Sequence, residues 1–176
     1  MGNAYKVLVT GPFNVGKTEF IRTISDIPIV STERRMSDHL ASTKDETTVA
    51  MDYGQVRLDS TVFHLYGTPG QPRFDFMWDI LAKEMQAFIL LVDSCDHGSF
   101  MQAKQLIRIF RRKGRVPYLV AANMQDKEKA LSPEAIGKRL GLDEKTPIVP
   151  CVATDKASVR NVLEELKALI YEAGNS

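Results

Sequence analysis

Residues 11–18 carry the pattern with the most specific chemistry in the chain. They read Gly-Pro-Phe-Asn-Val-Gly-Lys-Thr and match GxxxxGK[ST] at every fixed position. In this pattern, glycines let backbone amides curl around phosphate groups at the N-terminus of a helix. The Lys17 ammonium then reaches the β and γ oxygens, and the Thr18 hydroxyl ligates Mg²⁺. The amides expected to face the phosphates belong to Asn14, Val15 and Gly16. The pattern predicts a site for a nucleoside triphosphate with Mg²⁺.

Further segments follow in an order and at a spacing that resemble the Ras-like small GTPases over nearly the whole chain. Residues 68–71, Thr-Pro-Gly-Gln, resemble the end of the second-switch signature DxxGQ. The resemblance implies that the Gly70 amide contacts the γ-phosphate and that Gln71 orients the attacking water. Thr48 resembles the first-switch threonine that closes over Mg²⁺ and the γ-phosphate. Its neighbour Thr47 is an alternative for that role, and an ordinary strand threonine is another interpretation.

Two segments near the C-terminal end resemble the base-reading motifs of the same family. Residues 123–126, Asn-Met-Gln-Asp, are similar to NKxD, and Ala153, followed by Thr154, resembles the alanine whose amide reads the guanine carbonyl. The implied ligands of the base are Asn123, Met124, Asp126, Ala153 and Thr154. The Asp126 carboxylate can accept from the ring N–H and the exocyclic amine of guanine, an arrangement that adenine lacks. An ordinary strand-to-loop turn is the alternative interpretation of residues 123–126.

Within the superfamily, the resemblance is to prokaryotic MglA-like and to Arf-like GTPases. Residues 66–71 and the glycine-proline opening of the phosphate loop resemble MglA, and residues 92–94 resemble Arf. This resemblance implies a partner protein that reads or regulates the switch segments, including a roadblock-fold protein similar to MglB.

The chain departs from the family pattern at three positions. Gly67 stands where the second-switch aspartate is expected, and Asp93 is a candidate replacement, with a polar strand end or a helix cap as alternatives. Met124 replaces the lysine of NKxD, so weaker nucleotide affinity is expected. Phe13 replaces a small glycine and crowds the path of an arginine supplied by a partner. An arginine from within the chain or a solvated surface charge are the two interpretations of Arg34, Arg35 and Arg73.

The elements that position these residues follow from the apolar runs. Strands are expected at 5–10, 48–58, 61–66, 88–92, 118–122 and 147–149, with a loop at 28–47 and helices after 18, near 74–81, at 100–112, from 132 and at the C-terminal end. Continuous apolar strands indicate burial on both faces. The expected fold is therefore an α/β P-loop NTPase G domain. It has a mostly parallel sheet of about six strands, one antiparallel edge hairpin and helices on both faces, in a single domain at 1–176.

Composition gives weaker guidance. Lys and Arg (23) nearly balance Asp and Glu (22), and the net charge of +1 gives no field strong enough to favour nucleic acid or an anionic membrane. No nucleic-acid partner is therefore expected. No apolar run approaches the length of an integral membrane span. Cys95 and Cys151 are isolated, which is typical of a reducing cytoplasm. A basic cluster at residues 108–115 is read as a solvated helix end, with a partner-binding patch as the alternative.

The expected function is a cytoplasmic switch that binds GTP or GDP with Mg²⁺ and slowly hydrolyses GTP, with Gln71 and Lys17 as catalytic residues and Thr18 and Thr48 as metal ligands. A non-hydrolysing interaction module that keeps the nucleotide is the alternative. A small-molecule P-loop kinase would explain Lys17 and Thr18, but it would give no role to Gln71 or Asp126.

Overall fold

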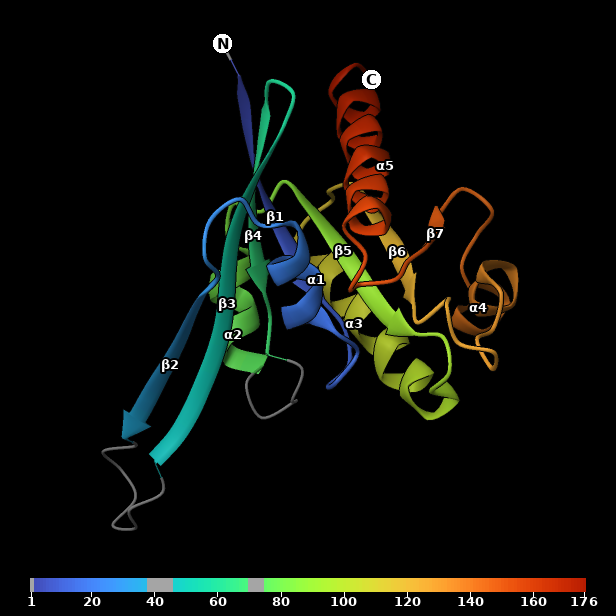
Figure 1. The fold of residues 1–176 in the computed structure, drawn as a ribbon, viewed down its shortest axis with the longest axis horizontal. Helices are drawn as coiled ribbons and strands as arrows, with labels where there is room; N and C mark the ends of the chain where they lie inside the picture. The colour runs from blue at the N-terminus through green and yellow to red at the C-terminus, as the bar shows by residue number, and fades with distance from the viewer. Residues whose placement is uncertain (1, 38–45, 70–74) are drawn as a thin grey trace.

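The computed structural model describes residues 2–37, 46–69 and 75–176, with backbone alone for residues 32–37 and 46–50. Within this part of the chain, seven strands form one sheet in the order β2-β3-β4-β1-β5-β6-β7 (Figure 1). The strands are β1 (Asn3–Thr10), β2 (Val30–Ser37), β3 (Glu46–Leu58), β4 (Thr61–Gly67), β5 (Ala87–Asp93), β6 (Tyr118–Asn123) and β7 (Ile148–Pro150).

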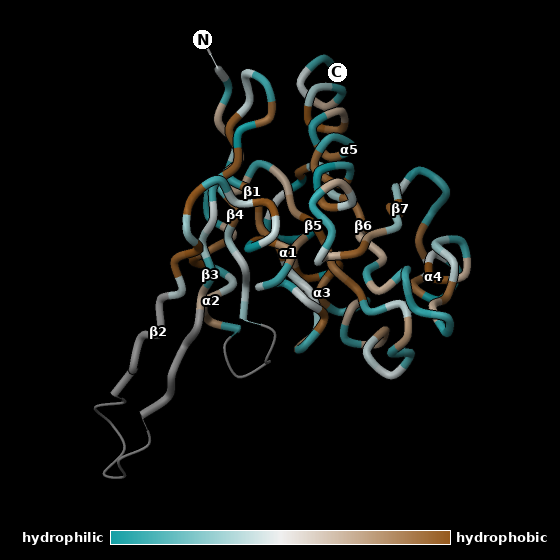
Figure 2. The backbone as a smooth tube through the Cα atoms, in the orientation of Figure 1, coloured by the Kyte–Doolittle hydropathy of each residue, from teal (hydrophilic) through white to brown (hydrophobic). Residues whose placement is uncertain are grey.

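Helices cover both faces of the sheet. The helices are α1 (Lys17–Ile24), α2 (Asp75–Ala82), α3 (Phe100–Lys113), α4 (Pro133–Leu140) and α5 (Lys156–Gly174), and a short 3₁₀ turn at His97–Ser99 precedes α3. Buried side chains of α1 and α5 pack with one face of the central strands, and those of α2, α3 and α4 pack with the other. In Figure 2 much of β5 and β6 is coloured brown, as are stretches of the helices.

Strand directions agree with the expected fold class. β4, β1, β5, β6 and β7 pair in parallel, whereas β3 pairs antiparallel with β4 through a hairpin at Asp59, whose φ is 55°. β5 shows why its sequence is continuously apolar: its residues from Ala87 to Val92 are all buried, because helices pack on both of its faces. The prediction of a mostly parallel sheet with an antiparallel hairpin and helices on both faces is confirmed.

The segment expected to be a loop at 28–47 contains a strand instead. β2 (Val30–Ser37) pairs antiparallel with β3, with Val30 opposite Tyr53 and Ser37 opposite Glu46. Its sequence, VSTERRMS, lacks the alternation that marks a half-buried strand. An edge strand needs hydrogen bonds on only one side, and charged residues are common there because they discourage further pairing. The loop prediction was therefore wrong for residues 30–37, and the sheet has seven strands.

Candidate functional site

The carboxyl ends of the parallel strands bring the predicted site residues to one edge of the sheet. β1 ends at Thr10 before the phosphate loop, β4 ends at Gly67, and β6 ends at Asn123. The loop after β7 carries Ala153. In an open α/β sheet this edge is where ligands bind.

The phosphate loop has the backbone that its sequence predicts. Gly11 and Gly16 have φ values of 155° and 101°, and Asn14 has a φ of 68°, so the chain curls between β1 and α1. A Cβ atom at Gly16 would lie 2.7 Å from Nδ2 of Asn123, and one at Gly11 would lie 2.3 Å from the carbonyl oxygen of Leu91. Glycine is therefore required at both ends of the loop, and the cradle it leaves suits a phosphate group at a helix N-terminus.

Lys17 lies across this loop. Its Nζ donates hydrogen bonds to the carbonyl oxygens of Gly11 at 2.6 Å and Pro12 at 2.8 Å. Burial lowers the pKa of the Lys17 ammonium from 10.5 to about 8, and the charge of Asp52 acts in the opposite direction. Phosphate oxygens would favour the charged form of this side chain.

Thr18 contacts a carboxylate that sequence reasoning missed. Its hydroxyl donates to Oδ2 of Asp52 at 2.5 Å, and Ser31 donates to Oδ1 of the same carboxylate at 2.7 Å. Asp52 lies on β3 directly opposite Gly67 of β4. A Cβ atom at Gly67 would lie 3.4 Å from Cβ and 3.7 Å from Oδ2 of Asp52. The Asp52 carboxylate thus lies beside the position of the second-switch aspartate that the chain lacks.

Asp93, the candidate replacement from sequence, is engaged elsewhere. Its Oδ1 accepts from the backbone amide of Cys95 at 2.9 Å, and its carbonyl accepts from the amide of Asp96. These bonds stabilise the turn after β5. The structure therefore supports the alternative of a polar strand end, with the Asp93 carboxylate bonded to the turn after β5, and Asp52 is the carboxylate next to Thr18.

The two residues before the second-switch segment, Thr68 and Pro69, are hydrogen-bonded to β1 and α2. Thr68 is buried; its hydroxyl donates to the hydroxyl of Thr10 at 2.9 Å, and its amide donates to the carbonyl of Val9 at 3.0 Å. The indole N–H of Trp78 donates to the carbonyl of Pro69 at 3.1 Å. These contacts fix the chain up to the point at which the switch begins. Gly70, Gln71 and Arg73 lie outside the described residues.

The first-switch candidates lie on the outer strands. Thr48 is opposite Arg35, and Arg34 is opposite Val49, in the β2–β3 ladder. Thr48 precedes Asp52 by four residues on β3, which corresponds to about 13 Å along a strand. The role of Thr48 as a metal ligand and the choice among the arginines stay predictions.

The base-reading candidates converge on one small cavity of about 130 Å³. It is lined by Gly16, Glu19, Asn123, Met124, Asp126, Lys127, Val152, Ala153 and Thr154. The five residues predicted from the NKxD-like and alanine motifs are thus brought together next to the phosphate loop. Met124 holds a φ of 66°, an uncommon backbone for a residue with a side chain, in the turn that presents Asp126.

Asn123 joins the three segments of the site. Its Nδ2 donates to the carbonyl of Val15 at 2.9 Å, and its Oδ1 accepts from the amide of Ala153 at 2.9 Å. Its own carbonyl accepts from the hydroxyl of Ser94 at 2.5 Å. Because the side chain is buried, these bonds are shielded from water and hold the phosphate loop against the base-reading loop.

The neighbouring Gln125 has a structural role. Its Nε2 donates to Ser94 Oγ and to the carbonyl of Leu131, both at 2.8 Å, and its amide donates to the carbonyl of Cys151. These contacts fix the turn between β6 and α4. Phe13, by contrast, is 63% exposed in the phosphate loop. Its effect on an arginine supplied by a partner stays a prediction.

The family model of the ADP-ribosylation factor family matches residues 2–170. The chain belongs to the Arf family of small GTPases. This Arf-family chain is 26% identical to the mutual gliding-motility protein MglA of Myxococcus xanthus over 181 aligned residues, which cover 92% of each chain. It is 28% identical over 141 residues to ADP-ribosylation factor-like protein 8b of Arabidopsis thaliana, covering 78% of this chain and 70% of that protein.

A relative and a solved structure extend this comparison. The uncharacterized protein MJ1339 of Methanocaldococcus jannaschii is 31% identical over 121 residues, covering 69% of the Arf-family chain and 70% of the relative. The Arl6 BBS3 small GTPase of Trypanosoma brucei, solved with the nucleotide analogue GppNp, has a TM-score of 0.73 at 20% identity. It covers 97% of this chain and 99% of its own. This second likeness shows the fold. Among the described helices, none has the length and hydropathy needed to cross a membrane.

Proposed function

We propose that residues 1–176 form one G domain that binds GTP and GDP with Mg²⁺ and hydrolyses GTP slowly. The observation that carries the proposal is the convergence at Asn123, whose side chain donates to the carbonyl of Val15 in the phosphate loop and accepts from the amide of Ala153. A phosphate cradle alone would suit any nucleotide. A carboxylate on the adjoining cavity, at Asp126, supports guanine.

In this proposal, the backbone amides of Asn14, Val15 and Gly16 and the Lys17 ammonium bind the phosphates. Asp126 accepts from the base. The Ala153 amide already donates to Oδ1 of Asn123. The amide of the adjacent Thr154, which also lines the cavity, is therefore proposed as a further donor to the guanine carbonyl. Met124 contributes an apolar wall without the ammonium of the family lysine.

The metal site is proposed around Thr18. A threonine hydroxyl that donates its proton to a carboxylate keeps its oxygen lone pairs free for a cation, and the 2.5 Å bond to Asp52 orients Thr18 in this way. When bound, Mg²⁺ neutralises charge on the β and γ phosphate oxygens. Thr48 joins this site only if the segment around it moves with the γ-phosphate, and such a movement would be the switch.

The proposed reaction is attack of water on the γ-phosphate, with Gln71 positioning the water and Lys17 stabilising the developing charge. The proposed compartment is the cytoplasm, where both free cysteines stay reduced. MglA similarity supports a roadblock-fold, MglB-like partner that regulates the switch.

Two measurements test the proposal. Competition of GTP and ATP against a fluorescent GTP analogue tests base choice, and equal affinity for the two nucleotides would leave only a general P-loop binder. Single-turnover release of phosphate from GTP, with Mg²⁺ or with EDTA, tests hydrolysis. If tight GTP binding is found without phosphate release, even with a roadblock-fold partner present, the chain is a non-hydrolysing interaction module.

A further inference from the structure

Positive charge is concentrated in one stretch of an otherwise balanced chain. Between Asp96 and Asp126 the sequence contains no acidic residue and six cationic ones, Lys104, Arg108, Arg111, Arg112, Lys113 and Arg115, although the whole chain has a net charge of only +1. Four of the six are arginines, whose planar guanidinium can form paired hydrogen bonds with a carboxylate.

The helix dipole accounts for only part of this cluster. Cations are favourable in the last turn of a helix, and α3 ends at Lys113. Arg115, however, lies beyond that end, and Arg108 lies more than one turn before it. Lys113 pairs with Asp79, but within the described residues Arg108, Arg112 and Arg115 form no salt bridge. Three guanidinium groups are thus exposed without a carboxylate partner in that part of the chain.

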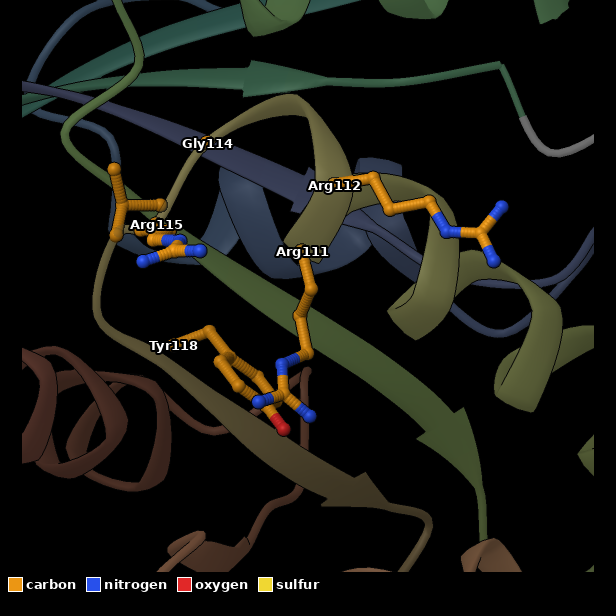
Figure 3. Close-up of a pocket in the computed structure, with 6 residues that line it drawn as sticks. Arg111, Arg112, Gly114, Arg115 and Tyr118 are labelled. Carbon is orange, nitrogen blue, oxygen red and sulfur yellow. The ribbon is translucent and has the colours of Figure 1, made fainter.

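Part of the cluster surrounds a hollow. Arg111, Arg112, Gly114, Arg115, Val116 and Tyr118 line a cavity of about 570 Å³. In Figure 3, Arg111 reaches down to the ring of Tyr118, whereas Arg112 turns to the other side of α3. The guanidinium carbon of Arg111 lies 5.8 Å from the centre of that ring, and Phe88 stacks on the ring at 4.7 Å. The wall of the hollow is therefore a fixed aromatic ring with cations beside it.

Asp143 interacts electrostatically with Arg111 but does not line this hollow. Oδ1 of Asp143, in the loop after α4, accepts hydrogen bonds from the amides of Lys145 and Thr146 and from the Thr146 hydroxyl. Those bonds, chiefly the hydroxyl bond from Thr146, lower the pKa of Asp143, and Arg111 adds a smaller effect through its charge. Asp143 thus accepts hydrogen bonds within its own loop and partly screens Arg111, whereas Arg115 forms no salt bridge with the described residues.

We propose that this hollow, lined by Arg111, Arg115 and Tyr118, is a docking site for an acidic peptide segment of a partner protein. A cavity of this size accommodates a few side chains, whereas a nucleic-acid backbone needs an extended basic track. A membrane surface is disfavoured because none of the large exposed apolar side chains in the described residues lines the hollow. The positive charge of the hollow is instead complementary to the carboxylates of an acidic peptide.

The site lies away from the nucleotide. Tyr118 begins β6 and Asn123 ends it, so the hollow is at the opposite edge of the sheet from the phosphate and base loops. An acidic segment would therefore occupy this site whether or not the switch segments are engaged, and it goes beyond the proposed GTPase function.

The test is fluorescence anisotropy with a fluorescein-labelled peptide of about ten glutamates at low salt, where exposed charges are least screened. The variant Arg111→Gln/Arg115→Gln is expected to weaken binding at least about tenfold, because it removes two charge-assisted contacts. The matched control Arg22→Gln/Arg160→Gln removes the same net charge from α1 and α5, and it should change affinity by less than about twofold. Circular dichroism melting checks that each variant is folded.

A charge-retaining pair and two other probes complete the experiment. Arg111→Lys/Arg115→Lys keeps the charge and should retain binding better than the glutamine pair while losing the paired hydrogen bonds. Equal losses in the glutamine pair and the control pair would overturn the proposal, because binding would then follow net charge alone. It would also be overturned if phosphatidylserine vesicles or an oligouridine bound through Arg111 and Arg115 while the glutamate peptide did not.

Discussion

Replacement of Asp52 tests the least expected residue of the site. Asp52→Ala removes the carboxylate that accepts from Thr18 at 2.5 Å and from Ser31 at 2.7 Å. A hydrogen bond to a charged group contributes about 1.5–3 kcal/mol, which corresponds to roughly ten- to a hundredfold in affinity. We expect this loss in GTP affinity measured with Mg²⁺, because the Thr18 hydroxyl is no longer oriented for the metal.

The assay compares affinity for a fluorescent GTP analogue with Mg²⁺ and with EDTA. In the wild type Mg²⁺ should tighten binding, and Asp52→Ala should remove most of that gain while leaving the EDTA value nearly unchanged. Asp52→Asn keeps the shape of the side chain without its charge and serves as the matched control, with an intermediate loss expected.

A compensating change makes the test sharper. Asp52→Ala/Gly67→Asp moves the carboxylate to the facing residue of β4, where a Cβ atom would lie 3.1 Å from Cδ1 of Ile21, a side chain that must shift slightly. Recovery of the Mg²⁺ effect is expected. If Asp52→Ala weakens binding equally with and without Mg²⁺, Asp52 supports the loop and not the metal, and the reasoning fails.

Four further predictions follow from the same site and its surroundings. Asp126→Asn should weaken GTP on the order of a hundredfold and improve xanthosine triphosphate in competition binding, because one acceptor becomes a donor; an unchanged ranking would contradict guanine recognition. Gln71→Leu should preserve GTP binding and slow single-turnover phosphate release, whereas an unchanged rate would place the water elsewhere. Gly16→Ala should abolish binding measured by calorimetry, since its Cβ would lie 2.7 Å from Asn123 Nδ2 at a φ of 101°; retained affinity would contradict the cradle. Burial raises the pKa of the Cys151 thiol to about 12, so iodoacetamide at pH 8 should label exposed Cys95 and spare Cys151 until the chain is unfolded. Mass spectrometry of peptides measures the labelling, and labelling of Cys151 in the folded protein would contradict the prediction.

Local motifs made much of the site predictable. The phosphate loop is specified by eight adjacent residues whose glycines, lysine and threonine each have a chemical reason. The structure places them from the end of β1 to the first turn of α1, as expected. The base-reading residues follow apolar strands, and strands that are parallel end at the same edge of the sheet. These features depend on short-range sequence or on a general rule of α/β folds.

Other features depend on contacts that sequence spacing does not reveal. Asp52 meets Thr18 only because β3 pairs with β4 in a register that sets it opposite Gly67. Asp93 was the predicted replacement for the second-switch aspartate because it ends an apolar strand beside β1. Its carboxylate instead accepts a hydrogen bond within the turn after β5. β2 was predicted as a loop because its sequence has no apolar alternation, which an edge strand does not need.

The hydrogen bonds of Asn123 tie nucleotide binding to the integrity of the whole chain. They connect Asn123 to Val15, 108 positions earlier in the sequence, and to Ala153, 30 positions later. A fragment lacking either of these two residues would therefore have no complete site. A ligand that binds only the folded state stabilises it by about 4 kcal/mol when its concentration is a thousand times its Kd. The cellular supply of guanine nucleotide would then set the resistance of this protein to proteolysis, and a chain emptied of nucleotide would be degraded sooner than a loaded one.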